Sequence, residues 1–303
     1  MRVAAIDCGT NSIRLLIADV VGERLTDVAR RMEIVRLGAG VDRTGRLAPE
    51  AIDRTRRALI GYAAETAELG ISRVRMVATS ASRDASNADD FRVMVRGVLG
   101  VEPEVITGDE EARLSFTGAV RGLAAEPPFL IVDIGGGSTE FVTGHSTSER
   151  AISMDIGCVR MTERHLKSDP PTAVEIAAAE RDITAAVDTA LAAVPGRAAR
   201  TLVGLAGSVT TVTALALGLP GYDAARIHHA SVSREAVAKV TADLLAATVA
   251  ERRALPVMHP GRADVIGAGA LILRIILERS GQSAVVASEH DILDGIAWGL
   301  AAD

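Results

Sequence analysis

The sequence repeats one short feature near the start of each half: an apolar strand, an aspartate, a polar turn rich in glycine, and a returning apolar strand. The two copies read Ala5-Ile6-Asp7-Cys8-Gly9-Thr10-Asn11-Ser12 and Val132-Asp133-Ile134-Gly135-Gly136-Gly137-Ser138-Thr139. A repeat with so long a period indicates a duplicated domain rather than a solenoid. We therefore expect an α/β protein of two lobes, each opened by one of these hairpins.

The apolar pattern predicts similar elements in both halves. In the first half it predicts strands at 3–6, 13–20, 28–37, 74–79 and 105–107, and helices at 49–69, 89–99 and 109–121. In the second half it predicts strands at 129–133, 140–143, 151–154, 202–206 and 283–287, and helices at 171–192, 209–217, 234–247, 262–280 and 291–301. A Glu-Pro-Pro break within residues 122–128 divides the chain into an N-terminal lobe (1–124) and a C-terminal lobe (125–303). The last helix could cross back to pack on the first lobe.

Composition limits the classes of partner. The formal net charge is −6, and aromatic residues make up 2% of the chain. An acidic chain does not favour broad binding to nucleic acids or membrane surfaces, and platforms that stack bases need aromatic side chains. A locally basic cleft can still bind a small polyanion. We expect neither a nucleic-acid nor a membrane partner.

The cysteines and the apolar runs point to the cytoplasm. Cys8 and Cys158 show neither the spacing of metal ligands nor a disulfide framework. No apolar run approaches the roughly 18 residues of a membrane-spanning helix, and no charged region followed by an apolar run opens the chain. We expect a cytoplasmic protein.

Both hairpin turns have the composition of a phosphate-binding loop. Turns rich in Gly, Ser and Thr can point consecutive peptide N–H groups at phosphate oxygens, and glycine lets the phosphate approach the backbone. The aspartates at the strand ends, Asp7 and Asp133, suit a divalent cation or an oriented water. A single turn of this kind is commonly an ordinary hairpin, but two in matching places favour phosphate binding. The predicted phosphate-binding residues of these turns are Gly9, Thr10, Asn11, Ser12, Gly135, Gly136, Gly137, Ser138 and Thr139.

Three further segments each allow two interpretations. Gly207 and Ser208 follow a strand and begin a helix, which is either an anion site or a common strand–helix turn. Glu110 and Glu111 lie in the first turn of a helix, where they either complement the helix dipole or provide a general base. Arg83 follows a strand and a run of hydroxyl side chains, so it either binds phosphate or lies on the surface beside a helix cap.

Together these motifs resemble the exopolyphosphatase / guanosine pentaphosphate phosphohydrolase (Ppx/GppA) family, whose fold is that of the sugar kinase–actin–Hsp70 superfamily. The resemblance extends over nearly the whole chain, and its most specific part is the second turn with its flanking residues, Asp133 to Glu140. The other matching segments, in order, are Asp7 to Ser12, Thr79 to Ala85 with Asn87, Gly108 to Arg113, Gly157 to Arg160, Gly204 to Thr211, and Arg262 to Asp264.

The resemblance implies a role for each matching residue. Glu111 corresponds to the catalytic base, because it lies two residues before Arg113, with Glu110 as the alternative. Asp133 and Glu140 correspond to the acidic residues that handle Mg²⁺ and the attacking water, and we add Asp7 as a third metal candidate. Arg83 corresponds to an arginine that contacts phosphate, and Gly136, Gly137, Ser138, Gly207 and Ser208 to the backbone cradle. A homodimer is implied by the resemblance alone.

The expected activity is the Mg²⁺-dependent hydrolysis of the terminal phosphoanhydride of inorganic polyphosphate, with water activated by Glu111. Longer members of the family carry additional C-terminal helical domains, so a chain of two core lobes is expected to prefer short polymers. Removal of the 5′ γ-phosphate of guanosine pentaphosphate is the first alternative, although no guanine-reading residue is evident. An ATP-dependent kinase of the same fold and a non-catalytic polyphosphate or nucleotide sensor are the alternatives from other classes.

Overall fold

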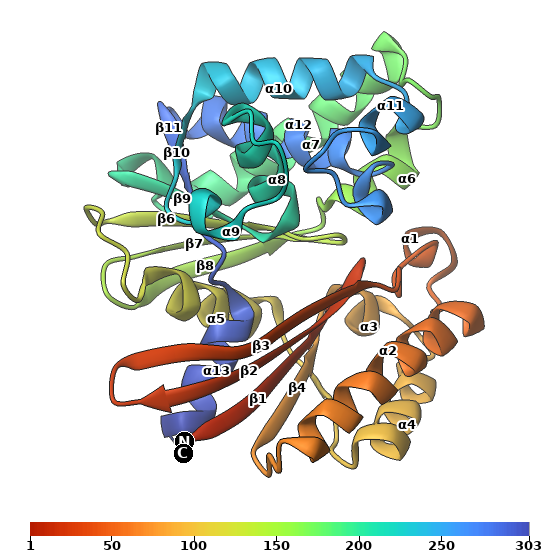
Figure 1. Cartoon of the computed structure of the whole chain (residues 1–303). Helices are drawn as coiled ribbons and strands as arrows, with labels where there is room; N and C mark the ends of the chain where they lie inside the picture. Colours follow the sequence, from red (N-terminus) through yellow and green to blue (C-terminus); the bar gives the residue numbers. More distant parts are fainter. Residues whose placement is uncertain (303) are drawn as a thin grey trace. The chain divides into compact units, whose positions relative to one another are not determined.

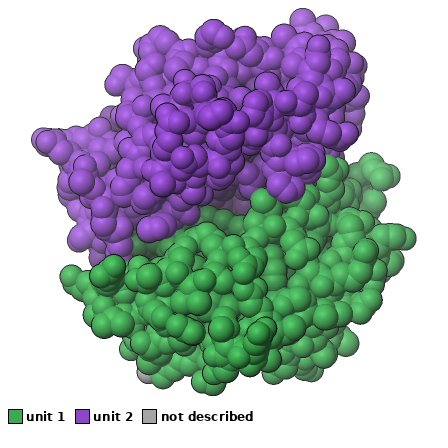
Figure 2. Space-filling model, viewed as in Figure 1, with its two compact units in different colours: residues 1–118, 291–303 green, residues 119–290 purple. Residues whose placement is uncertain are grey.

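The computed structural model describes residues 1–302, so Asp303, the end of the predicted C-terminal lobe, lies outside the described residues. The chain forms two compact units (Figure 2). The first unit comprises Met1–Gly118 with the described residues from Asp291 onward, and the second comprises Ala119–His290. The division that the sequence suggested, between residues 124 and 125, stays a prediction about folding domains.

The first unit is built on a five-stranded sheet with the strand order β3-β2-β1-β4-β5 (Figure 1). β1, β2 and β3 form an antiparallel meander, while β4 and β5 run parallel to β1. The strands are β1 (Arg2–Cys8), β2 (Ser12–Val21), β3 (Arg24–Ile34), β4 (Val74–Ala78) and β5 (Glu104–Val105). β3 begins and ends earlier than the predicted strand 28–37, because Gly22 at φ 57° makes the β2–β3 turn and Arg36 at φ 52° redirects the chain.

Helices cover both faces of this sheet. They are α1 (Val41–Thr44), α2 (Pro49–Glu68), α3 (Ser80–Asp84), α4 (Ala88–Leu99), α5 (Gly108–Val120) and α13 (Ile292–Ala302). Alternate residues of β1 enter two different cores, as the two-residue period of a strand requires. Ala4 and Ile6 pack in the core that contains residues of α2 and α4. Val3 and Ala5 pack in the core with α13, so the end of the chain belongs to this first unit.

The second unit repeats this topology. Its sheet has the order β10-β11-β9-β6-β7-β8, in which β8-β7-β6-β9-β11 reproduces β3-β2-β1-β4-β5 in both order and direction. The strands are β6 (Phe129–Ile134), β7 (Thr139–Gly144), β8 (Ser148–Met154), β9 (Thr201–Leu205), β10 (Ser231–Ser233) and β11 (Ala284–Ala287). The duplication that the two hairpins predicted is therefore a duplication of the whole sheet, with β10 added at one edge.

Helices of the second unit pack on its sheet and on one another. They are α6 (Cys158–His165), α7 (Ala173–Ala193), α8 (Ala206–Ala216), α9 (Ala224–Ile227), α10 (Arg234–Ala246), α11 (Val249–Arg253) and α12 (Ile266–Ser280), with short 3₁₀ turns at Gly196–Ala198 and Pro260–Arg262. α12 is buried on nearly every side and packs against α6, α7, α8 and α10. It begins later than the predicted helix 262–280, because residues 260–262 form the 3₁₀ turn. Within residues 1–302, no helix combines the length and the apolarity needed to cross a membrane.

Candidate phosphate-binding and catalytic residues

The first hairpin closes with a two-residue turn at Thr10 and Asn11. The N–H of Gly9 donates to the carbonyl of Ser12 at 2.9 Å. The carbonyl of Asn11 accepts from the N–H groups of Val35 and Arg36, so the segment after β3 holds the turn from one side. These backbone contacts fix the shape of the predicted phosphate loop before any ligand binds.

The hydroxyl of Thr10 forms a hydrogen bond with another side chain of the first unit. Thr10 Oγ1 lies 2.8 Å from Ser80 Oγ, and both residues are buried. A Cβ on Gly38 would lie 2.4 Å from Thr10 Cγ2, so a larger residue at 38 would push the turn away. Thr10 therefore supports the loop through its side chain, while Asn11 and Ser12 are only half-buried.

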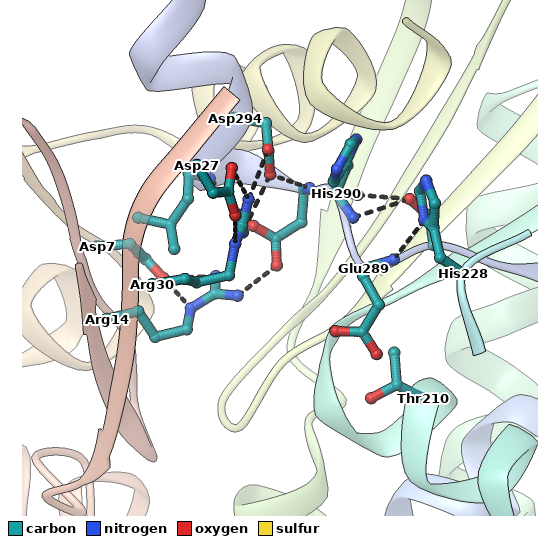
Figure 3. A network of polar contacts seen from close by, with 12 residues as sticks. Asp7, Arg14, Asp27, Arg30, Thr210, His228, Glu289, His290 and Asp294 are labelled. Carbon is teal, nitrogen blue, oxygen red and sulfur yellow. Dashed lines mark hydrogen bonds and ion pairs between the residues drawn. The ribbon is translucent and has the colours of Figure 1, made fainter. Parts of the chain in front are cut away.

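Asp7 is the second-last residue of β1 and lies directly opposite Arg14 of β2. Arg14 Nη2 and Nε donate to Asp7 Oδ2 at 2.7 and 3.1 Å (Figure 3). Arg14 Nη1 donates to Asp291 Oδ2. Asp7 Oδ1 is buried and has no hydrogen-bond partner within residues 1–302. Burial raises the pKa of Asp7, and Arg14 offsets this only in part.

Arg83 and Glu111 meet on the first unit. Arg83 lies in α3, and its Nη1 donates to the carbonyl of Ile106 at 2.9 Å and approaches Glu111 Oε2 at 3.4 Å. Glu111 lies in the first turn of α5 and is buried, with 9% of its surface exposed. The structure thus brings the predicted phosphate arginine and the predicted base together.

Glu110 faces a different neighbour. Its Oε1 lies 2.8 Å from Arg75 Nη2 of β4, and 44% of its side chain is exposed. Because consecutive residues of a helix are about 100° apart around its axis, α5 cannot bring Glu110 and Glu111 to the same place. Glu110 stands in a partly exposed ion pair with Arg75, apart from Arg83.

The second hairpin closes in the same way, at Gly136 and Gly137. The N–H of Gly135 donates to the carbonyl of Ser138 at 3.0 Å, and Asp133 pairs directly with Glu140 across β6 and β7. Both carboxylates are buried, and Ser153 Oγ donates to Glu140 Oε1 at 2.7 Å. Thr139 Oγ1 donates to the carbonyl of Ile156, so this predicted phosphate ligand turns its hydroxyl toward the protein.

The start of α6 holds the carbonyl groups of this second turn. The N–H of Cys158 donates to the carbonyl of Gly135 and that of Val159 to the carbonyl of Gly136, both at 2.9 Å. Arg160 Nε donates to the carbonyl of Gly137 at 2.8 Å. In a trans peptide the C=O and the next N–H point in opposite directions. The N–H groups of Gly136, Gly137 and Ser138 therefore point away from α6, as a phosphate cradle requires.

Glycine is needed where α6 meets the turn. A Cβ on Gly157 would lie 2.3 Å from the carbonyl carbon and oxygen of Gly136, which no side chain can tolerate without a shift of the backbone. Gly157 belongs to a segment that matches the family motif. The absence of a side chain at this residue lets α6 approach the loop.

Gly207 and Ser208 lie in the first turn of α8, which begins at Ala206 with a left-handed φ of 67°. A Cβ on Gly207 would lie 2.1 Å from Arg262 Cζ, so the guanidinium lies directly against the start of the helix. Ser208 is buried, and a Cβ on Gly269 would meet its Oγ at 2.2 Å. The arginine adds positive charge to a helix N-terminus, which already favours anions.

Three residues near these groups were not among the predicted site residues: Arg14, Asp291 and Arg262. Arg14 could have been found, because a hairpin with a two-residue turn places the residue seven after Asp7 directly opposite it. Arg262 stood within a matching motif but received no role. Asp291 carries no local signal, since only the tertiary structure brings it to Arg14.

Comparison with known proteins tests the resemblance. The model of the Ppx/GppA phosphatase family matches residues 16–301. The chain belongs to this family. Its family resemblance and its predicted two-lobed fold, with mixed sheets flanked by helices as in actin-like ATPases, are thereby confirmed.

Several members of the Ppx/GppA family are similar over their full length. Exopolyphosphatase 2 of Mycobacterium tuberculosis is 54% identical, with 99% of this chain and 98% of the relative covered. A crystal structure of an exopolyphosphatase-like protein superposes with a TM-score of 0.94 at 44% identity, covering 97% of this chain and 96% of the other. The structure of the Aquifex aeolicus family member superposes with a TM-score of 0.85 at 32% identity, covering 100% of this chain and 98% of the other.

Mg²⁺, which the Ppx/GppA resemblance implied, can be tested against the residues present. Within residues 1–302, no three His, Cys, Asp or Glu side chains gather in an arrangement that could hold a metal ion by themselves. Mg²⁺ commonly takes only one or two carboxylates and completes its shell with waters and substrate phosphates. On the first unit the buried Oδ1 of Asp7 fits that manner of binding, and on the second unit the cross-strand pair Asp133 and Glu140 fits it independently.

Proposed function

We propose that this chain is an exopolyphosphatase, which hydrolyses the terminal phosphoanhydride bond of inorganic polyphosphate and releases orthophosphate. The observation that carries the proposal is the 54% identity, over nearly all of both chains, to an exopolyphosphatase of Mycobacterium tuberculosis. The N–H groups of the second turn that point away from α6 support it, because they suit a substrate that presents phosphate oxygens alone.

The phosphate contacts come from backbone and arginine. The N–H groups of Gly136, Gly137 and Ser138 bind phosphate oxygens, and Arg262 with the N-terminus of α8 adds positive charge at Gly207 and Ser208. Arg83 contacts phosphate on the first unit. Such groups act by positioning and by stabilising charge, which are the main requirements of phosphoryl transfer.

Glu111 accepts a proton from the attacking water. Its burial and its contact with Arg83 support this role over Glu110, which is held by Arg75 on the exposed side. A general base of this kind typically accelerates a reaction about 10²–10⁴-fold.

The residues that would hold Mg²⁺ are Asp7 on the first unit and Asp133 with Glu140 on the second. When bound, the ion neutralises the charge on phosphate oxygens and polarises the phosphorus for attack. Like charges directly opposite in a sheet are destabilising, so the pairing of Asp133 with Glu140 supports a cation beside them.

A substrate panel tests the proposed function. Phosphate release is measured from tripolyphosphate, from longer polyphosphates, from guanosine pentaphosphate and from ATP, each with and without Mg²⁺. We expect Mg²⁺-dependent release from polyphosphate, with short chains preferred. Faster release from guanosine pentaphosphate would replace the proposal with the nucleotide activity. Transfer of the ATP γ-phosphate to an acceptor would indicate a kinase, and binding without release a sensor.

We also propose a cytoplasmic location and a homodimer. Cys8 and Cys158 are both free and buried, which suits a reducing compartment. The dimer rests on the family resemblance. Light scattering of the purified protein across a concentration series tests it, and a constant monomer mass would contradict it.

A further inference from the structure

Arg14 joins two aspartates that are far apart in the sequence. Its guanidinium donates to Asp7 Oδ2 with two nitrogens and to Asp291 Oδ2 with the third. Asp291 is the residue at which the chain re-enters the first unit, directly before α13. Both aspartates are about 95% buried, at 5% and 4% exposure, so the shared arginine holds them in a fixed arrangement.

The side chain of Asp291 is itself held in place. Its Oδ1 accepts the N–H of Leu293 at 3.0 Å in the first turn of α13. Burial alone would raise the pKa of Asp291, but Arg14 and then Arg30 outweigh it and leave the pKa below its usual value. Asp291 is therefore a charged partner of Arg14, and Asp7 shares the arginine with it.

The backbone of Asp291 contacts the helix that carries Glu111. A Cβ on Gly118 of α5 would lie 1.8 Å from the carbonyl oxygen of Asp291. In return, a Cβ on Gly295 of α13 would lie 2.0 Å from the carbonyl oxygen of Leu114 in α5. The two helices thus meet backbone to backbone through a pair of glycines, which leaves little freedom for α5 to shift against α13.

We propose that Asp291 is a positioning residue, which sets the Asp7 carboxylate through Arg14 and seats the Glu111 helix through its own backbone carbonyl. This inference rests on the proposed function for the roles of Asp7 and Glu111. One residue at the start of the last helix then fixes both a metal candidate and the candidate base of the first unit.

The charges explain how Asp291 acts on Asp7. Two carboxylates share one guanidinium, so the three side chains together keep a net negative charge beside the unpartnered Oδ1 of Asp7. If Asp291 loses its charge, Arg14 has Asp7 as its remaining charged partner and neutralises it more completely. Asp7 is then a poorer cation ligand, although no atom that would touch the cation has been changed.

The test compares Asp291→Asn with Asp294→Asn. Asp294 lies on the same helix and pairs with Arg30 at 2.8 Å, so its substitution also breaks an Arg–Asp pair (Figure 3). Asparagine at 294 keeps an oxygen that can accept the N–H of Asp291. For each full-length protein, Mg²⁺ binding is measured by titration calorimetry without substrate, kcat and KM with tripolyphosphate, and stability by urea unfolding.

We expect Asp291→Asn to lower both Mg²⁺ affinity and kcat by about 10–100-fold, the usual cost of removing a residue that orients a metal ligand, with KM near the wild-type value. Asp294→Asn should lose comparable stability but keep the wild-type Mg²⁺ affinity and kcat. Equal Mg²⁺ affinity and kcat in the two variants would overturn the inference.

A second variant covers the case in which Asp291→Asn does not fold. Arg14→Lys keeps the positive charge, but a single ammonium cannot reproduce the fork that reaches both carboxylates. We expect the same loss of Mg²⁺ affinity and kcat, and a folded Arg14→Lys protein with wild-type values of both would refute the inference. If the wild type releases no phosphate from polyphosphate, the proposed function fails, while calorimetry on the same variants still decides the role of Asp291.

Discussion

Asp133 and Glu140 are direct cross-strand partners at the mouth of the second hairpin, whereas the equivalent partner of Asp7 in the first hairpin is Arg14. The two hairpins share turn length, register and the hydrogen bond that closes the turn. They differ in the charge placed opposite the aspartate. A carboxylate facing a carboxylate attracts cations, while a carboxylate facing a guanidinium is oriented by it. The duplicated hairpins have therefore diverged in their electrostatics and kept their shape.

Replacing Glu111 by glutamine should abolish most turnover. We expect Glu111→Gln to lower kcat on tripolyphosphate by about 10²–10⁴-fold, because an amide cannot accept the proton of water. The control is Glu110→Gln, which removes an exposed ion pair worth about 0.2–1 kcal/mol at most and should keep near wild-type kcat. Steady-state phosphate release measures both, and a greater loss in Glu110→Gln would reverse the assignment.

Arg83→Lys should reduce both substrate binding and turnover. Lysine keeps the charge, but its single nitrogen cannot hold the Ile106 carbonyl and Glu111 in the fixed geometry of a guanidinium. We expect a higher KM and a fall in kcat of about tenfold, of the order of 1.4 kcal/mol. Arg96→Lys, at an exposed ion pair with Glu102, is the control and should change neither constant. If Arg83→Lys has the kcat and KM of the wild type, the contacts of Arg83 with Ile106 and Glu111 do not contribute to substrate binding or turnover.

Gly157→Ala should damage the second turn. The added Cβ would meet the Gly136 carbonyl at 2.3 Å, so the loop or α6 must move. We expect a loss of about 1–3 kcal/mol in the free energy of unfolding and a higher KM. Gly61→Ala is the matched control, because a Cβ there meets nothing within 4 Å in the exposed part of α2. It should gain about 0.5–1 kcal/mol from helix propensity. Urea unfolding distinguishes the two, and equal stability in them would refute the packing argument.

His229 should make stability depend on pH. Burial lowers the pKa of His229 below 6.5, and the nearby His290 lowers it further. Its ring stacks on that of His228 with centroids 3.7 Å apart. The unfolded chain then binds more protons than the folded protein between the two pKa values, so stability is highest above about pH 7 and falls as pH decreases through 6.5.

His229→Asn tests this dependence, because asparagine tolerates the left-handed φ of 64° at this residue. Melting temperatures from pH 8 to pH 5 should fall less steeply in His229→Asn than in the wild type. Parallel curves for His229→Asn and the wild type would contradict the lowered pKa of His229.

Within the candidate site, the sequence identified the loops better than the contacts around them. The turns at Gly9–Ser12 and Gly135–Thr139 were recognisable because glycine and hydroxyl residues follow an apolar strand, and that local pattern largely fixes a hairpin. Thr10 and Thr139 were predicted to bind phosphate, but in the described residues their hydroxyls contact the Ser80 hydroxyl and the Ile156 carbonyl. Their role as direct ligands stays a prediction, with the peptide N–H groups as the better supported part.

The sequence by itself determined the duplicated α/β fold, the family and the order of the motifs, because apolar periodicity and glycine-rich turns are local properties. It left Glu110 and Glu111 as alternatives for the base. Two consecutive helical residues point in different directions, and only the packing of the helix decides which neighbours each one meets. The tertiary structure separated them by placing Arg75 beside one and Arg83 beside the other. It also brought Asp291 to Arg14, a contact across 277 residues of sequence that no local pattern encodes. Only the packing of α13 on β1 and β2 creates that contact.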